Sequence, residues 1–213
     1  KIEKTLESQK LESAEVIEWE ITTDRALYEN HLKYIKDQIK LGNTYQVNYT
    51  LRKHSNVISN PYGFFLEKAQ DAPYAAFIDS DEHAIISMSP ELFFKLSGDS
   101  LICKPMKGTS KRGKTLHEDI ALMEDLKNSE KDKAENIMIT DMLRNDMGKI
   151  SNTGSVKVLS EFDIEKYPTV WQMTSSIESK ASASITGIFE ALFPCASVTG
   201  APKVSSMKII SEI

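Results

Sequence analysis

The stretch ELFFKLSGDSLICKPMKG, residues 91–108, holds two short runs typical of β-strands on either side of the polar turn SGDS. The two residues at the centre of that turn, Gly98 and Asp99, suit the tip of a two-stranded hairpin. With the tip there, the register of the hairpin places Glu91 opposite Met106. The stretch therefore predicts a hairpin whose open end carries a carboxylate.

Lys107 lies one residue beyond that pair and is followed directly by Gly108. Side chains alternate between the two faces of a strand, so Glu91 and Lys107 would point apart in a regular hairpin. They can meet only if Pro105 ends the strand and Gly108 redirects the chain. Two interpretations of Lys107 stay open: a solvated turn residue, or an amine placed for nucleophilic attack, which needs a desolvated or cationic surrounding.

Patterns elsewhere in the chain mix helix and strand. Residues 1–24 are polar and rich in Glu, Lys and Ser, which is typical of a linker, and Gly42 is suited to end the first helix. The hairpin and the two strand-like runs before it favour one antiparallel meander. We expect the remaining strands at 44–53, 74–78, 84–88, 154–162 and 167–179, and helices at 25–41, 62–70, 116–129, 132–148, 184–194 and 203–213.

The composition is that of a globular protein, with 213 residues, 40% hydrophobic and 27% charged, and a formal net charge of −5. The negative charge argues against nucleic acid or an anionic membrane as the main partner, and no apolar run approaches the length of a membrane span. The charged N-terminus is unlike a signal peptide, so a cytoplasmic location is expected. Two cysteines without a CxxC spacing predict buried free thiols rather than a disulfide framework or a zinc site.

Glu135 lies among apolar residues of the helical pattern at 132–148, which predicts a largely buried helix. A carboxylate in such surroundings needs a partner, because burying it alone is very costly. Two interpretations stay open. Glu135 can form an ion pair with Lys131 or Arg144, or it can be a ligand for a hard cation such as Mg²⁺, together with ligand oxygens and a second acidic residue.

The segment SVTGAPK, residues 197–203, places Thr199, Gly200 and Ala201 directly before a proline suited to start a helix. Backbone N–H groups at such a turn and helix start suit a carboxylate. The alternative is a plain turn followed by an exposed Lys203.

Seven segments, in order along the chain, resemble those of the chorismate-utilising enzymes, which include anthranilate synthase component I, aminodeoxychorismate synthase component I, and the isochorismate and salicylate synthases. The resemblance implies an α/β fold of the α+β type, with layered antiparallel β-sheets and outer helices. It makes 25–213 the N-terminal and central part of a chorismate-binding catalytic domain, and 1–24 a linker or remnant of an N-terminal subdomain. The segments are GNTYQVNYT, SPELFF, KPMKGTSKRG, EKDKAENIMITDMLRNDMGKI, GSVKV, YPTVWQMTSSI and FPCASVTGAPKVSSMKII.

Within the family, a lysine at the position of Lys107 is typical of aminodeoxychorismate synthases, whereas anthranilate synthases have a small residue there. The resemblance implies that Lys107 attacks C2 of chorismate as the C4 hydroxyl leaves, and that ammonia then adds at C4 and expels the lysine. The product is 4-amino-4-deoxychorismate, the precursor of 4-aminobenzoate in folate synthesis. Ammonia would come from a glutamine amidotransferase subunit. The alternatives are another chorismate enzyme, such as anthranilate synthase, and a non-catalytic chain that binds the amidotransferase or a metabolite.

The resemblance also implies roles for other residues. Glu91 would be the general acid/base beside the leaving hydroxyl, and Glu135 a ligand of a Mg²⁺ ion that bridges to a substrate carboxylate. The residues implied to bind substrate are Thr109, Gln172, Thr199, Gly200, Ala201 and Lys203.

Two features depart from the family pattern. Gln172 stands where the family commonly has a histidine, and an amide can form hydrogen bonds but cannot transfer a proton. The chain also ends at Ile213, before the family's segments with a substrate-binding arginine, a glycine-rich turn and the second acidic metal ligand. We therefore expect this chain to be a fragment of a longer polypeptide.

Overall fold

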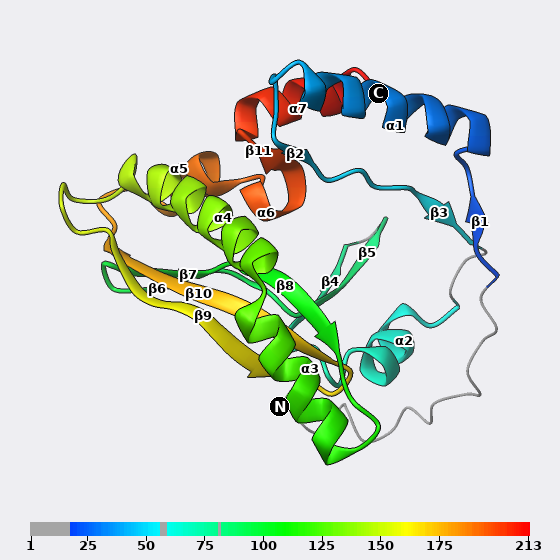
Figure 1. Ribbon diagram of the computed structural model, residues 1–213, viewed down its shortest axis with the longest axis horizontal. Coiled ribbons are helices and arrows are strands. Elements are labelled where there is room, and N and C mark those ends of the chain that lie inside the picture. Colours follow the sequence, from blue (N-terminus) through cyan, green and yellow to red (C-terminus); the bar gives the residue numbers. More distant parts are fainter. Residues whose placement is uncertain (1–17, 56–58, 81) are drawn as a thin grey trace. The chain divides into compact units, whose positions relative to one another are not determined.

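A computed structural model describes residues 18–55, 59–80 and 82–213 (Figure 1). The chain divides into a smaller compact unit, with residues 51–90 and the described residues up to Arg25, and a larger one with residues 26–50 and 91–213. Most of the predicted linker at 1–24 lies outside the described residues. Among the residues that the structure describes, no helix is long and apolar enough to cross a membrane.

The described residues of the smaller unit form one short helix, α2, and two small antiparallel sheets. The helix begins at Pro61, and the side chain of Asn60 caps it by accepting a hydrogen bond from the backbone N–H of Gly63 at 2.8 Å. The rings of Phe65 and Phe77, 5.7 Å apart, pack the helix against β4. The elements are β1 (Glu20–Ile21) paired with β3 (Lys53–His54), α2 (Pro61–Lys68), and β4 (Tyr74–Asp79) paired with β5 (Ala84–Ser89).

A five-stranded antiparallel sheet forms the centre of the larger unit. Its long strand β10 pairs with β9 on one side and with both β7 and β8 on the other, while β6 pairs with β7. β7 and β8 therefore follow one another along the same neighbour, with Pro105 between them. The strands are β6 (Leu92–Ser97), β7 (Ser100–Lys104), β8 (Met106–Lys111), β9 (Lys157–Lys166) and β10 (Val170–Lys180).

Two consecutive helices, α3 and α4, pack against β8 and β10 of this sheet (Figure 1). Each begins at a capping side chain: Thr115 accepts from the N–H of Glu118 at 3.2 Å, and Ser129 accepts from the N–H of Asp132 at 3.3 Å. The helices are α3 (Leu116–Asn128) and α4 (Glu130–Gly148), and the other elements of this unit are α1 (Arg25–Lys40), β2 (Gln46–Val47), α5 (Ile185–Leu192), α6 (Ala196–Thr199), β11 (Gly200–Ala201) and α7 (Lys203–Ser211), with β2 and β11 paired.

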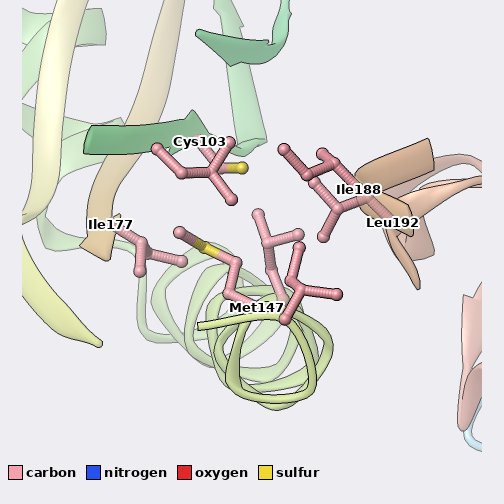
Figure 2. Close-up of a cluster of buried hydrophobic side chains, with 8 residues drawn as sticks. Cys103, Met147, Ile177, Ile188 and Leu192 are labelled. Atoms are coloured by element: carbon pink, nitrogen blue, oxygen red, sulfur yellow. The ribbon is translucent and has the colours of Figure 1, made fainter. Parts of the chain in front are cut away.

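The core of the larger unit lies between the sheet, α4 and α5 (Figure 2). Side chains from all three point toward one another there, and burying each large one contributes about 1.5–3 kcal/mol relative to leaving it in water. Burial raises the pKa of the Cys103 thiol to about 12, so this free cysteine is a protonated core residue, as predicted. Cys195 is also free but only partly buried. The cluster comprises Leu101, Cys103, Leu143, Met147, Ile150, Ile177, Ile188 and Leu192.

The predicted hairpin is confirmed, but its predicted register holds only from the tip to Lys95, because a shift of one residue then pairs Leu92 with Lys104 instead of Pro105. Leu96 faces Leu101 and Ser97 faces Ser100, so Gly98 forms part of the tip, where it adopts φ +61°. The antiparallel meander is wrong, because β4 and β5 form a sheet of their own while β6 and β7 belong to the five-stranded sheet.

Two further predictions need correction. The strand expected at 44–53 is reduced to the two-residue strands β2 and β3, because the chain at β2 pairs with β11, which is equally short. Helix α4 is buried along one face only, and Ile137 on another face is 51% exposed. The prediction overstated the burial of this helix, because apolar residues occur around its whole circumference and their spacing does not reveal which face meets the sheet.

Candidate active site

The strand ends just before Pro105, and a bulge follows, where the sequence predicts an irregularity. β7 ends at Lys104, and β8 begins beyond Pro105. Along β10, Thr174 pairs with Met106 and Gln172 with Thr109, so two residues of β8 lie opposite one residue of β10. This is a β-bulge, and its extra residues are Lys107 and Gly108, of which Gly108 adopts φ +98°. The bulge supplies the change of direction that a regular hairpin lacks.

Glu91 lies at the open end of the hairpin, and it meets Met106 through its side chain, since the shift in register means that the two are not paired as predicted. Its Oε1 accepts a hydrogen bond from the backbone N–H of Met106 at 3.3 Å. Burial raises the pKa of the Glu91 carboxyl, and hydrogen bonds from Met106 and Ser197 together with the positive charge of Lys107 oppose the rise without cancelling it. A carboxyl with a raised pKa close to an amine is suited to giving and taking protons.

Ser197 is absent from the residues predicted from the sequence. It lies in α6, more than a hundred positions after Glu91, and nothing in the sequence pattern connects the two. Its carbonyl accepts a hydrogen bond from Asn48 Nδ2 at 2.7 Å, and the backbone N–H of Asn48 donates to the carbonyl of Thr199 at 2.8 Å. The segment around Asn48 thus holds the turn after α6 next to Glu91.

Gly200 makes this turn possible. It adopts φ +145°, and a Cβ added to it would lie 2.1 Å from the carbonyl oxygen of Gln46, so only glycine fits. The buried hydroxyl of Thr44 donates to the carbonyl of the next residue, Ala201, at 2.8 Å. Close backbone contact therefore fixes the three residues predicted to form a carboxylate-binding turn, of which Thr199 is the first.

Lys203 is engaged within the protein. Its ammonium group donates to Asp146 Oδ2 at 3.1 Å and to the carbonyls of Ala191 and Leu192 at 3.3 and 3.2 Å. The last two belong to the C-terminal end of α5, where a cation is favourable. The side chain is 14% exposed, and it ties α7 to α4 and α5.

Thr109 and Gln172 lie side by side beyond the bulge. They are a cross-strand pair of β8 and β10, and Thr109 Oγ1 donates to Gln172 Oε1 at 2.9 Å. One predicted substrate-binding side chain thus lies on β8, which carries Lys107, and the other on its neighbour β10.

Glu135 lies at the border of the buried face of α4 with 34% of its side chain exposed, and its carboxylate is 3.9 Å from the amine of Lys131. The ion pair is one of the two interpretations that the sequence leaves open. Among the described residues, no group of three or more His, Cys, Asp or Glu side chains could hold a metal ion. A single hard carboxylate fits Mg²⁺ only as one member of a set that oxygen atoms of a bound ligand, water or residues elsewhere complete.

Comparison with known proteins shows which enzymes this chain resembles. A family profile described as chorismate binding enzyme matches residues 1–213. Aminodeoxychorismate synthase component 1 of Escherichia coli is 35% identical over 98% of this chain and 48% of its own length. Anthranilate synthase component 1 of Aquifex aeolicus is 34% identical over 92% of this chain and 40% of its own.

A solved structure agrees in fold. Anthranilate synthase component I of Streptococcus pneumoniae superposes with a TM-score of 0.83 at 28% identity, covering 93% of this chain and 44% of that one. The mixture of helix and strand expected from the sequence is thus confirmed. The chain spans about half the length of the relatives that it matches.

Proposed function

The chain belongs to the chorismate-binding enzymes, and from that we propose that it carries the nucleophile and the general acid/base of an aminodeoxychorismate synthase. The observation behind the proposal is the bulge that presents Lys107 close to Glu91, whose pKa is raised. A relative with the name aminodeoxychorismate synthase component 1 is similar over nearly the whole chain.

In the proposed reaction, the amine of Lys107 attacks C2 of chorismate, the ring double bonds shift, and the C4 hydroxyl leaves. Glu91 gives that hydroxyl a proton, so it departs as water. Ammonia then forms a bond to C4, the double bonds shift back, and the bond between C2 and the lysine nitrogen breaks. Chorismate and ammonia thus yield 4-amino-4-deoxychorismate and water, and the lysine is returned unchanged.

The remaining residues would hold the substrate. Backbone groups of the turn formed by Thr199, Gly200 and Ala201 would bind a carboxylate, and Thr109 and Gln172 would hydrogen-bond polar groups of the ring. Lys203 would act indirectly, because it already ties the start of α7 to α4 and α5.

Glu135 would be one ligand of a Mg²⁺ ion, whose charge would neutralise a substrate carboxylate. Replacing Glu135 by Gln should then shift the magnesium titration of activity to much higher concentration, and an unchanged titration would reject this role.

A second subunit would supply the ammonia. The name component 1 of the relatives fits an enzyme with more than one component, and we propose a glutamine amidotransferase as the other one. A cytoplasmic location fits a pathway that uses soluble metabolites.

Incubation of the full-length protein with chorismate, Mg²⁺ and ammonium, followed by chromatography, tests the reaction. We expect aminodeoxychorismate, its loss in Lys107→Ala, and normal activity in Lys111→Ala, a control that changes an exposed lysine of the same strand. Without ammonium, mass spectrometry should find a chorismate-derived adduct on Lys107. Aminodeoxychorismate made at the normal rate by Lys107→Ala would overturn the covalent route.

The same assay decides against the alternatives. Anthranilate as the product would assign the chain to the other reaction of its relatives, represented by the proteins of Aquifex aeolicus and Streptococcus pneumoniae. Binding of chorismate without any product would leave a non-catalytic role.

A further inference from the structure

The bulge at Lys107 interrupts the regular pairing of β8 with β10. Opposite a bulge the ladder is locally disrupted, and a buried carbonyl without a donor costs free energy. The carbonyls of Lys107 and Met173 both lie where α4 packs against β8 and β10. One side chain, Asn136 of α4, donates a hydrogen bond to each of them.

Asn136 is 1% exposed, and its amide is fully used. Its Nδ2 donates to the carbonyl of Lys107 and to the carbonyl of Met173, both at 3.3 Å. Its Oδ1 accepts from the hydroxyl of Ser175 at 2.5 Å and from that of Thr140 at 3.4 Å. An amide has two donor hydrogens and two acceptor lone pairs, and here each has a partner.

These contacts fix which way the amide faces. The two hydroxyl groups donate to its oxygen, so the NH₂ group is directed to the two carbonyls. No other residue type of this size offers two donors and an acceptor together. Aspartate has the same shape but offers only acceptors, and it would place a negative charge beside the two carbonyl oxygens.

We propose that Asn136 is a positioning residue for Lys107: by bonding both carbonyls across the bulge, it sets where the lysine amine stands relative to Glu91. Insofar as it concerns catalysis, the proposal rests on the function proposed above. Asn136 acts through the backbone. The expected cost of losing it is a displaced nucleophile, and a displacement of about 1 Å at a reacting group can lower the rate roughly a hundredfold.

The test compares Asn136→Asp and Asn136→Ala with Asn145→Ala, a control on an exposed position of the same helix. In the full-length protein, we expect kcat and the rate of adduct formation on Lys107 to fall roughly a hundredfold in both Asn136 variants. KM for chorismate should stay within about threefold, because Asn136 lies behind the strand and does not bind substrate. The control should match the unchanged protein in all three quantities.

A second measurement does not depend on the reaction. Without chorismate, acetic anhydride acetylates deprotonated amines, and mass spectrometry of the peptide reports how the labelling of Lys107 varies with pH. We expect this profile to shift in Asn136→Ala, which adds no charge, relative to Asn145→Ala, because the distance between Lys107 and Glu91 changes. If wild-type protein makes no aminodeoxychorismate but the labelling profile shifts, the positioning role stands and the proposed function fails.

Variants that remain folded distinguish a positioning role from a purely structural one. Ser175→Ala removes one hydroxyl that orients the amide and is the milder change if the Asn136 variants fail to fold; it should produce a smaller shift in the same direction. A folded Asn136→Ala, or failing that a folded Ser175→Ala, with an unchanged labelling profile and unchanged kcat would overturn the proposal.

Discussion

Replacing Gly108 by alanine tests the packing of the bulge without any assumption about the reaction. Gly108 adopts φ +98°, which costs a residue with a Cβ roughly 1–2 kcal/mol. The added methyl group would also lie 3.0 Å from Asp132 Cβ, 3.1 Å from Met173 Cβ and 3.3 Å from a methyl of Leu126. Those neighbours belong to two helices and the central strand, so they cannot all withdraw, and overpacking of this kind costs about 1–3 kcal/mol.

The two effects can be separated with a matched variant. Gly154 has φ +78°, but nothing lies within 4 Å of a Cβ added there, so Gly154→Ala carries the backbone strain alone. Alanine also stiffens the unfolded chain, which recovers about 0.4–1 kcal/mol in both variants. We expect Gly154→Ala to lose about 1 kcal/mol of unfolding free energy and Gly108→Ala about 3 kcal/mol.

Urea denaturation followed by circular dichroism measures both values, with the slope of free energy against urea checked for constancy. Equal losses in the two variants would refute the reasoning, since they would mean that the helices do not press on the bulge. A larger loss in Gly108→Ala would show that α3 and α4 hold the chain at Lys107 in place.

Two further predictions concern pH. Burial raises the pKa of Glu91 above its ordinary value of 4.5, so the contribution of this group to stability is fully present below pH 4.5 and is lost as pH rises through the folded-state pKa. Glu91→Gln should therefore gain stability relative to wild type when urea denaturation is repeated from pH 4 to pH 7. A constant difference in unfolding free energy would contradict this. Hydrogen bonds from Arg112 hold the pKa of Asp119 below its ordinary value of 3.8, helped by N–H groups of Gly113 and Trp171 and opposed by burial, so this contribution is present above pH 3.8 and is lost as pH falls through the folded-state pKa. Asp119→Asn should be less stable than wild type at pH 7, with a gap that narrows in acid; a gap of the same size at pH 3 and pH 7 would show that the charge of Asp119 is not what stabilises the fold.

Local signals predicted the elements that depend on neighbours in sequence. Helix α3 begins at Leu116, as predicted, directly after the capping Thr115, whereas α4 begins at Glu130, directly after the capping Ser129 and two residues before the predicted start. The turn at Gly98 set the register of its hairpin, because a turn of that length leaves the strands little choice. That register holds only from the tip to Lys95, and beyond the shift Glu91 contacts Met106 through its side chain.

The predictions that failed concern residues whose partners lie far away in the sequence. A strand was expected around Gln46 because its neighbours alternate in polarity, yet its backbone pairs with β11 for only two residues. The exposure of Lys203 could not be inferred either, since its acceptors come from α4 and α5. Such pairings depend on which backbone groups meet after the core has formed, and periodicity carries no record of that.

The sequence by itself determined most of the helices, the tip of the hairpin, the order of the family motifs and the presence of Lys107, because these depend on residue type and on contacts within a few positions. Only the tertiary structure decided where that lysine stands. The path of β7 and β8 along β10 creates the bulge, Asn136 donates hydrogen bonds to carbonyls of β8 and β10 there, and α6 brings Ser197 to Glu91. Buried polar groups must find partners, and in this protein those partners lie on elements distant in sequence.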